Sequence, residues 1–321
     1  MTVSRSVLNG QSREVTIEPR LSASDEVIGV VRDGVARAYP LSVLRWHEVV
    51  NDSLGGPLLV TYCPLCASGI TATRRVGGKS TVFGVSGLLW RSNLVMYDTA
   101  SGSLWSQLVA TAIRGPRAGE TLPLVPSTLT TLASWRESHP DTEILLPPPE
   151  SETISGAGPF DYVADRYARY RASRQPGFGS TPDAGGPTRR PKFWGLQSTG
   201  RHGPTYPVVR EAGVVNDTVG GRSVVVTTVP DEGVSALRGT LVGYDWRADG
   251  NQFTFSSDTP EYMRAGGTRW EVATGRGVDG PYAGVQLGRL EDARTTHWFA
   301  WKEFYPDTSK FGSHLLTAIP S

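Results

Sequence analysis

Hydrophobic positions along this chain fall into short runs that turn residues separate. Val27–Arg32 and Val35–Tyr39 flank the dipeptide Asp33-Gly34, and Asp-Gly between apolar-rich runs predicts a β-hairpin. Further runs of this kind are Pro57–Tyr62, Ile70–Val76, Ser80–Val85, Leu94–Asp98 and Ser103–Gln107. The pattern predicts a chain built mainly of short strands.

Two stretches have the wider spacing that is typical of helices. Pro40 opens the first, PLSVLRWHEVV, and a Gly-Gly-Pro sequence breaks the chain after it; proline is favoured in the first turn of a helix. The second runs from about Ser127 to Ser138 and ends before Pro140, since the residue before a proline disfavours the helical conformation.

The order of these patterns recurs in the second half of the chain. AYPLSVLRWHEVVNDSLGGPLLVT resembles TYPVVREAGVVNDTVGGRSVVVTT, and both Asn51 with Asn216 and Trp105 with Trp270 lie 165 residues apart (216 − 51 and 270 − 105). Matches at one spacing over such a length predict a tandem duplication.

The repeat defines the expected fold and domains. We predict a β-rich α+β fold, a tandem duplication of a small, mostly antiparallel β domain in which a helix closes each copy. The first copy spans residues 1–145, a linker or arm spans 146–190, and the second, degenerate copy spans 191–321. The arm's segment DYVADRYARYRASR alternates tyrosine with arginine; it predicts a solvated helix or an arm across the two domains, rather than a surface for single-stranded nucleic acid.

The repeat also separates architecture from chemistry. The Asn-Asp and Gly-Gly pairs, a Gly-Pro turn and the two tryptophans occur in both copies, so they predict turn geometry and buried packing. The distinctive side chains do not recur: His47 corresponds to Ala212, Glu48 to Gly213, Cys63 to Thr228, Cys66 to Asp231 and Gln107 to Val272. These residues of the first copy are therefore the functional candidates.

The amino-acid composition limits which partners and cellular location we expect for this protein. The net charge is +1, with 38% hydrophobic residues, so no bulk positive field predicts nucleic acid or an anionic membrane as a partner. No signal-like segment and no run of about 18 apolar residues is present. We therefore expect a cytoplasmic protein that acts on a small-molecule substrate, without a membrane partner, and a homo-oligomer is compatible with the sequence.

The chain's two cysteines, Cys63 and Cys66, come directly off a predicted strand. In a cytoplasmic chain a C-x-x-C pair indicates metal binding or redox chemistry. His47 is the natural third ligand, and Met96 could add a thioether. This soft ligand set favours a copper ion, chiefly Cu(I), with zinc as the second choice. The leading hypothesis is a copper-dependent oxidoreductase.

Other interpretations remain open. A C-P-x-C pair can also cycle between dithiol and disulfide, and two buried cysteines can serve packing alone. The duplication is equally compatible with a non-catalytic binding scaffold. A nucleobase deaminase is excluded because H-x-E and P-C-x-x-C are both absent.

The candidate catalytic residues are polar groups that the pattern places near the cysteines. Tyr97 and Asp98 end a predicted strand, Gln107 follows another, and Glu48 directly follows His47. With Trp105, Tyr97, Asp98 and Gln107 would line a pocket beside the metal.

Several motifs occur together in this order: WHEVVNDSLGG, VTYCPLC, VFGVSGLLWRSNLVMYD, SLWSQ and AIRGPRAG, with FAWKEFYPDT near the end. From about Asp25 to Thr308 the chain resembles the domain-of-unknown-function family 3179. The resemblance implies a two-copy bacterial family without an established activity, many of whose members are exported or membrane-attached. The family usually has glycine after the second cysteine, where this chain has Ala67.

Overall fold

The computed structural model divides the chain into two compact units, residues 1–179 and 180–321. It describes residues 3–8, 11–16, 21–147, 160–172, 192–196, 202–229, 240–290 and 293–310. The division falls inside the segment that the sequence assigns to an arm. The glycine-rich end of that arm, residues 177–191, lies outside the described residues.

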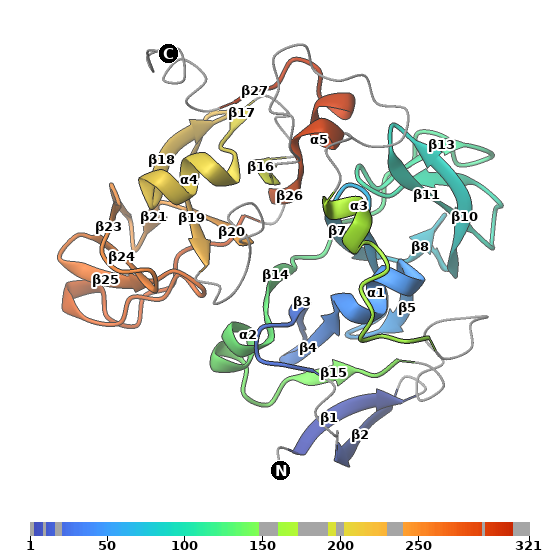
Figure 1. The fold of residues 1–321 in the computed structure, drawn as a ribbon, viewed down its shortest axis with the longest axis horizontal. Helices are drawn as coiled ribbons and strands as arrows, with labels where there is room; N and C mark the ends of the chain where they lie inside the picture. The colour runs from blue at the N-terminus through green and yellow to red at the C-terminus, as the bar shows by residue number, and fades with distance from the viewer. Residues whose placement is uncertain are drawn as a thin grey trace. The chain divides into compact units, whose positions relative to one another are not determined.

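Short strands dominate the first unit (Figure 1). Its strands are β1 (Val3–Leu8), β2 (Gln11–Thr16), β3 (Glu26–Arg32), β4 (Val35–Pro40), β5 (Val49–Ser53), β6 (Pro57–Cys63), β7 (Ser68–Thr73), β8 (Arg75–Val76), β9 (Lys79–Ser80), β10 (Phe83–Trp90), β11 (Asn93–Asp98), β12 (Leu104–Ser106), β13 (Thr111–Arg114), β14 (Thr128–Thr131) and β15 (Glu143–Leu145). Its helices are α1 (Leu41–His47), α2 (Leu132–Ser138) and α3 (Ala168–Ala172).

Three main sheets form among these described strands. Their orders are β14-β3-β4-β15-β1-β2, β5-β6-β7 and β10-β11-β12-β13. Pairing is antiparallel except where β15 meets β4 and β1. Helix α1 packs its buried Leu41 and Leu44 into the core that β4 and β6 share with it.

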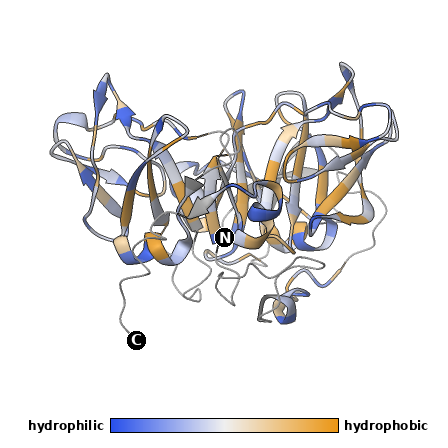
Figure 2. Cartoon of the chain, turned by 90° about the horizontal axis from the view of Figure 1, so that it is seen from above, coloured by the Kyte–Doolittle hydropathy of each residue, from blue (hydrophilic) through white to orange (hydrophobic). Residues whose placement is uncertain are grey.

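The second unit is built in the same style. Its strands are β16 (Lys192–Leu196), β17 (His202–Gly203), β18 (Val214–Val219), β19 (Arg222–Val229), β20 (Thr240–Asp245), β21 (Arg247–Ala248), β22 (Asn251–Gln252), β23 (Ser256–Ser257), β24 (Tyr262–Ala265), β25 (Thr268–Glu271), β26 (Ala293–His297) and β27 (Ser309–Lys310). Its helices are α4 (Tyr206–Ala212), the 3-10 turn η1 (Gly280–Tyr282) and α5 (Trp298–Phe304). In each unit, hydrophobic residues concentrate along the strands (Figure 2).

Most strand predictions are confirmed, and the chain is a β-rich α+β fold with mostly antiparallel sheets and few helices. The Asp33-Gly34 hairpin joins β3 to β4, with both turn residues at positive φ. The first predicted helix is wrong at its end. It stops at His47, and the β-branched Val49 and Val50 begin strand β5 instead.

The second predicted helix is wrong at its start. Residues 128–131, the threonine-rich sequence TLTT, form strand β14 against β3. The helix begins only at Leu132, where the Thr131 side chain accepts a hydrogen bond from the Ser134 backbone at 3.3 Å. Threonine favours both an extended strand and the N-cap position, which explains the late start. The predicted end before Pro140 is confirmed.

Equivalent contacts occur in the two units. Asn51 makes two hydrogen bonds to the backbone of Phe83, at 2.8 and 2.7 Å, and Asn216 makes the same pair to Phe255, at 2.7 and 2.8 Å. Trp105, which packs edge-on against Phe83, and its counterpart Trp270 are both fully buried. These are the contacts that a duplication predicts, and the duplication itself stays a prediction.

Another pair of equivalent contacts involves helices α2 and α5, which close the two units. Trp135 in α2 donates from its indole nitrogen to Thr142 at 2.8 Å. Trp301 in α5 donates in the same way to Thr308 at 2.9 Å. Both indoles are buried, so each needs this acceptor.

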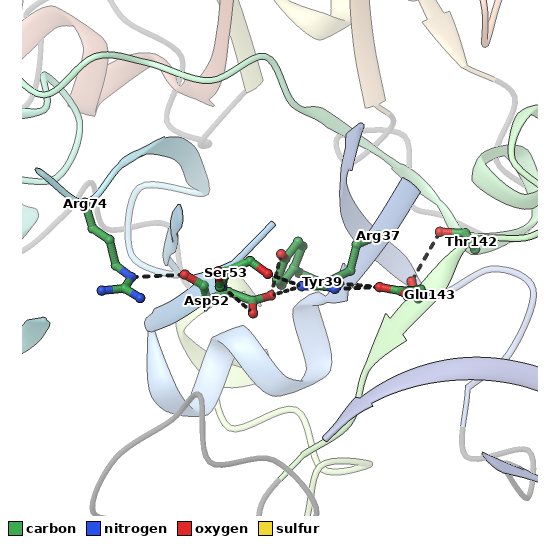
Figure 3. Close-up of polar contacts among 7 residues, drawn as sticks. All are labelled: Arg37, Tyr39, Asp52, Ser53, Arg74, Thr142 and Glu143. Atoms are coloured by element: carbon green, nitrogen blue, oxygen red, sulfur yellow. Dashed lines mark hydrogen bonds and ion pairs between the residues drawn. The ribbon is translucent and has the colours of Figure 1, made fainter. Parts of the chain in front are cut away.

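Asn51 and Asp52 lie in strand β5 and not in a turn, which corrects the expectation from sequence. The reason is long-range bonding: Asp52 accepts from Arg37 and from Tyr39, both at 2.7 Å. Arg37 also donates to Glu143 at 2.5 Å, so its guanidinium joins β4, β5 and β15 (Figure 3). These side chains are buried, and their hydrogen bonds offset the cost of removing the charges from water.

Candidate functional site

The two cysteines occupy one hairpin of the first unit. Cys63 is the last residue of β6, and Cys66 lies in the turn that leads to Ser68 at the start of β7. Cys63 pairs with Ser68 in the strand register. Both sulfurs belong to buried residues, with 1% of Cys63 and 0% of Cys66 exposed, and their side chains are hydrogen-bonded to each other.

Two polar side chains, one from strand β11 and one from the same hairpin, contact the sulfur of Cys66. The side-chain amide of Asn93, at the start of β11, donates to this sulfur at 3.1 Å. The hydroxyl of Ser68 lies 3.0 Å from it. Hydrogen bonds to sulfur favour its charged form, so this arrangement supports a thiolate at Cys66.

The side-chain amide of Gln107 hydrogen-bonds to the residues that contact the Cys66 sulfur. Its Oε1 accepts from Asn93 at 2.8 Å and from Ser68 at 3.0 Å. Its Nε2 donates to the hydroxyl of Thr61 at 3.0 Å and to the carbonyl of Ser68 at 3.1 Å. All four side chains are buried. The amide therefore fixes which atoms of its neighbours can face Cys66.

The surroundings of the two thiols shift their pKa values in opposite directions. Burial and the neighbouring sulfur raise the pKa of Cys63 well above its usual value. Burial alone would also raise the pKa of Cys66, but hydrogen bonds from Cys63, Ser68 and Asn93 outweigh that effect and lower it. The pKa values of the two thiols are therefore shifted in opposite directions, and Cys66 is the one whose thiolate is favoured.

His47 and Glu48 lie at the C-terminal end of α1. The Nε2 of His47 is hydrogen-bonded to the hydroxyl of Tyr162 at 2.8 Å, and burial lowers the pKa of the ring. The carboxylate of Glu48 accepts from the hydroxyl of Tyr167 at 3.1 Å. Burial raises the pKa of Glu48, and burial together with the Glu48 charge raises the pKa of Tyr167 to about 12.

The described part of the predicted arm, residues 160–172, packs on this end of the first unit, and we use the name arm for these residues from here on. Helix α3 forms the C-terminal end of these residues (Figure 1). Phe160 stacks on Trp46 with ring centroids 4.6 Å apart, and Arg166 lies over the Trp46 ring at 4.7 Å. The hydroxyl of Tyr170 donates at 2.8 Å to the carbonyl of Leu65, between the two cysteines. The described part of this segment ends in the short helix α3 and packs on the first unit, and an arm across the two domains stays a prediction.

Several non-glycine residues with a left-handed backbone conformation are direct neighbours of the site residues. Among the described residues, the non-glycine positions with positive φ are Asp33, Glu48, Ala67, Arg91, Ser92, Ala110 and Asp249. The two aspartates are ordinary hairpin residues. Glu48, Ala67 and Ser92 are the immediate neighbours of His47, Cys66 and Asn93. Such conformations cost free energy and persist where surrounding contacts enforce them, often at functional sites.

The remaining candidates lie elsewhere. Asp98 caps its own turn: it accepts from Ser101 at 2.6 Å and from the Trp105 indole at 2.9 Å. The Tyr97 side chain is 40% exposed and its ring lies against Gly84. These contacts give Asp98 a structural role in the turn after β11.

Met96 has a counterpart in the second unit. It is buried and pairs with Trp105 across β11 and β12, as Met263 pairs with Trp270 across β24 and β25. It also lies three residues from Asn93 on one strand, and residues at that spacing point to opposite faces. Its position is that of a core residue shared by both units.

The strand register corrects one correspondence between the halves. Thr61 pairs with Val49, and Thr227 pairs with Val214, so Cys63 corresponds to Val229 rather than to Thr228. Between these paired positions the second unit has one more residue than the first (227 − 214 = 13 against 61 − 49 = 12), which causes the shift. The counterpart of Cys66 lies outside the described residues. The thiol of Cys63 is still absent from the second unit.

Within the described ranges, no three side chains of the His, Cys, Asp and Glu types converge as a metal site would need. No helix in those ranges is long and apolar enough to cross a membrane.

The family model of a protein of unknown function, DUF3179, matches residues 6–308. The chain belongs to the DUF3179 family. The resemblance of the chain to that family is thereby confirmed. No similar curated protein and no similar solved structure was found. The function of this DUF3179 chain therefore has to be argued from its own side chains.

Sequence reasoning missed six residues that this site brings together. Asn93, Ser68 and Thr61 belong to the network behind Cys66, and Tyr162, Tyr167 and Tyr170 come from the arm. The sequence did contain a signal for Asn93. Asn93 lies three residues before Met96, and the residue three positions before the counterpart Met263 is Pro260, so the second unit lacks this asparagine. The tyrosines had no such signal, since they reach the site from about a hundred residues away.

Proposed function

We propose that the first unit carries a redox-active dithiol, Cys63 and Cys66, that reduces a small-molecule disulfide. The observation that carries this proposal is the hydrogen-bonded pair of sulfurs in which Cys66 also accepts from Asn93. A thiolate is the nucleophile in disulfide exchange. A second thiol three residues away is positioned to complete the reaction within the same turn.

The reaction proceeds in two exchanges. The Cys66 thiolate attacks one sulfur of the substrate, the substrate S–S bond breaks, and a mixed disulfide forms while the other half leaves as a thiolate. Cys63 then loses its proton and attacks the Cys66 sulfur, forming the internal disulfide and releasing the second half. Both released thiolates take up protons, one from Cys63 and one from solvent, so two electrons pass from the cysteine pair to the substrate.

The polar network supports the first exchange. Asn93 and Ser68 favour the thiolate over the thiol at Cys66 without placing a full positive charge beside it. The Ser68 hydroxyl has one hydrogen and two neighbours, the Cys66 sulfur and the Gln107 Oε1. It can turn toward the sulfur when the thiolate forms and back toward Gln107 when the disulfide forms.

Thiol titration tests the proposal. The native protein is incubated with oxidised glutathione at increasing ratios to reduced glutathione, and thiols are counted after denaturation. We expect both thiols to disappear together, the intact mass to fall by two hydrogens, and dithiothreitol to reverse the change. Cys63→Ser should trap a mixed disulfide at Cys66, and Cys66→Ser should form none. Thiols that stay unreactive in the native wild-type protein would refute the proposal and leave a packing or scaffold role.

A second candidate is a copper ion bound by the same two sulfurs, with zinc as the next choice. The observation that favours it is the adjacency of two sulfurs, one of them already favouring the thiolate, which suits a soft cation. A third ligand from His47 would require its ring to leave the Tyr162 hydroxyl. Metal content of protein purified without an affinity tag, compared with a Cys63→Ser/Cys66→Ser variant, tests it. Equal metal in both would exclude this candidate.

A further inference from the structure

Three tyrosine hydroxyls of the arm contact three different groups around the thiol pair. Tyr162 meets the His47 ring, Tyr167 meets the Glu48 carboxylate, and Tyr170 meets the Leu65 carbonyl within the Cys-Pro-Leu-Cys turn. The arm therefore covers the hairpin that carries both sulfurs.

The remaining arm contacts are with the rings of Trp46 and His47 and, through Tyr162, with the hydrophobic core. Phe160 stacks on Trp46 from the arm's start, and Arg166 packs on the same indole. Val163, in contrast, is 79% exposed. The arm is thus attached by ring contacts, single hydroxyls and the packing of Tyr162 on the core, and its hydroxyl contacts can open without unfolding the unit.

The backbone of Glu48 is held in an unfavourable conformation for its residue type. Its φ is 62°, its N–H donates to Leu44 at 2.8 Å, and its carbonyl accepts from Tyr62 at 2.9 Å. These bonds end helix α1 and fix the strand that leads to Cys63. A left-handed non-glycine residue costs roughly 1–2 kcal/mol, so the fold alone would favour glycine here.

The second unit has glycine at this position. Gly213 follows helix α4 with a φ of 72°, and a β-carbon there would lie 2.6 Å from the hydroxyl of Ser257. The same helix end is therefore built without a side chain. The first unit retains a side chain at a strained position, and the contact that this side chain makes is with Tyr167.

We propose that Glu48 is a positioning residue that holds the arm over Cys63 and Cys66 through its hydrogen bond from Tyr167. Release of this contact opens the thiol pair to its substrate. The inference rests on the proposed function only in taking the thiol pair as the reactive centre. It predicts that access to the sulfurs depends on one carboxylate and one hydroxyl, both outside the hairpin.

The test measures how fast N-ethylmaleimide alkylates the native, full-length protein. Glu48→Gly removes the carboxylate and relieves the backbone strain, whereas Tyr167→Phe removes only the hydroxyl. Each should accelerate alkylation by about tenfold or more, the scale of one hydrogen bond to a charged group. Glu48→Gln keeps an oxygen that accepts from Tyr167 and should stay within about threefold of wild type.

Ala110→Gly is the matched control. Ala110 is the other strained residue of the first unit whose counterpart at the same spacing, Gly275, is a glycine with positive φ. Its substitution should raise the urea midpoint and leave alkylation unchanged. Glu48→Gly should also have a midpoint no lower than wild type, so that faster alkylation does not come from unfolding.

The outcomes separate this inference from the proposed function. Wild-type alkylation rates in both Glu48→Gly and Tyr167→Phe, or equal acceleration in Ala110→Gly, would overturn the positioning role, even if the disulfide still forms. Faster alkylation in the two variants without any disulfide formation would support the positioning role and refute the dithiol function.

Discussion

The side-chain amide of Asn93 donates a hydrogen bond to the sulfur of Cys66 at 3.1 Å. Asn93 begins β11 and Cys66 lies in the β6–β7 turn, so the bond joins two different sheets. It gives Cys66 a polar partner in an interior where an unpaired thiolate would be strongly disfavoured. The reactivity of the thiol pair should therefore depend on Asn93.

Substitution of Asn93 tests that dependence through pH. Because the pKa of Cys66 is lowered, its reaction with thiolate-selective reagents should persist at a pH where an ordinary cysteine is protonated, and should decline only below that. Asn93→Ala should raise the pKa of Cys66 and slow its reaction at pH 7 by about tenfold. The measurement is the pH profile of the alkylation rate by mass spectrometry.

Asn51→Ala provides the control for Asn93→Ala. It removes two hydrogen bonds of the same kind, to the Phe83 backbone, but none to sulfur. It should lower the urea midpoint without moving the alkylation profile. A profile that shifts equally in both variants would mean that general destabilisation, and not the Asn93 amide, sets the reactivity.

Ala67→Gly should stabilise the protein. Ala67 directly follows Cys66 with a φ of 52°, and glycine adopts this conformation without the steric cost that alanine bears. We expect a gain of about 1 kcal/mol in the free energy of unfolding, measured by urea denaturation. Ala112→Gly, in strand β13, should instead destabilise, since that residue is buried without positive φ. A loss in both variants would contradict the assigned strain.

Arg37→Met should strongly destabilise the first unit. It leaves Asp52 and Glu143 buried without their shared cation, and breaking a buried pair in this way typically costs about 3–5 kcal/mol. Arg247→Met, which removes the exposed pair with Asp245, should have no measurable effect. Both losses of unfolding free energy are measured by urea denaturation. Comparable losses in the two variants would show that the buried Arg37 network is no more stabilising than an exposed ion pair.

Asp98 should make stability sensitive to acid. Burial would raise its pKa, but hydrogen bonds from Ser101 and Trp105 prevail and lower it. A carboxylate with a lowered folded pKa stabilises above its unfolded pKa of about 3.9, and that contribution is lost as the pH falls through the folded value. Asp98→Asn should flatten this acid limb of the stability curve. An unchanged limb would argue against the turn-capping role.

The two closing helices should respond alike to loss of their indole acceptors. Thr142→Val and Thr308→Val each leave a buried tryptophan N–H unpaired, which costs about 1–3 kcal/mol. Fluorescence-detected urea denaturation measures both losses. Losses of similar size would support equivalent roles in the two units, and a loss confined to one would contradict them.

The sequence by itself determined the β-rich fold and the position of most strands. Alternating hydrophobic runs and Asp-Gly or Gly-Gly pairs act locally, so β3, β4, β6 and the turns at Gly34 and Gly77 could be read directly. The sequence also singled out His47, Glu48, Cys63, Cys66 and Gln107, because the second half lacks their side chains. Where local preference is divided, as in TLTT before α2, strand pairing decided the outcome.

Only the tertiary structure decided which of these residues meet. Asn93 reaches Cys66 from another sheet, and Tyr167 reaches Glu48 from 119 residues away. Met96 and Asp98, candidates by proximity in sequence, instead face the Trp105 core and a turn. The physical reason is that a hydrogen bond to a buried group depends on where the folded backbone delivers each atom, and no local pattern of residue types encodes that position.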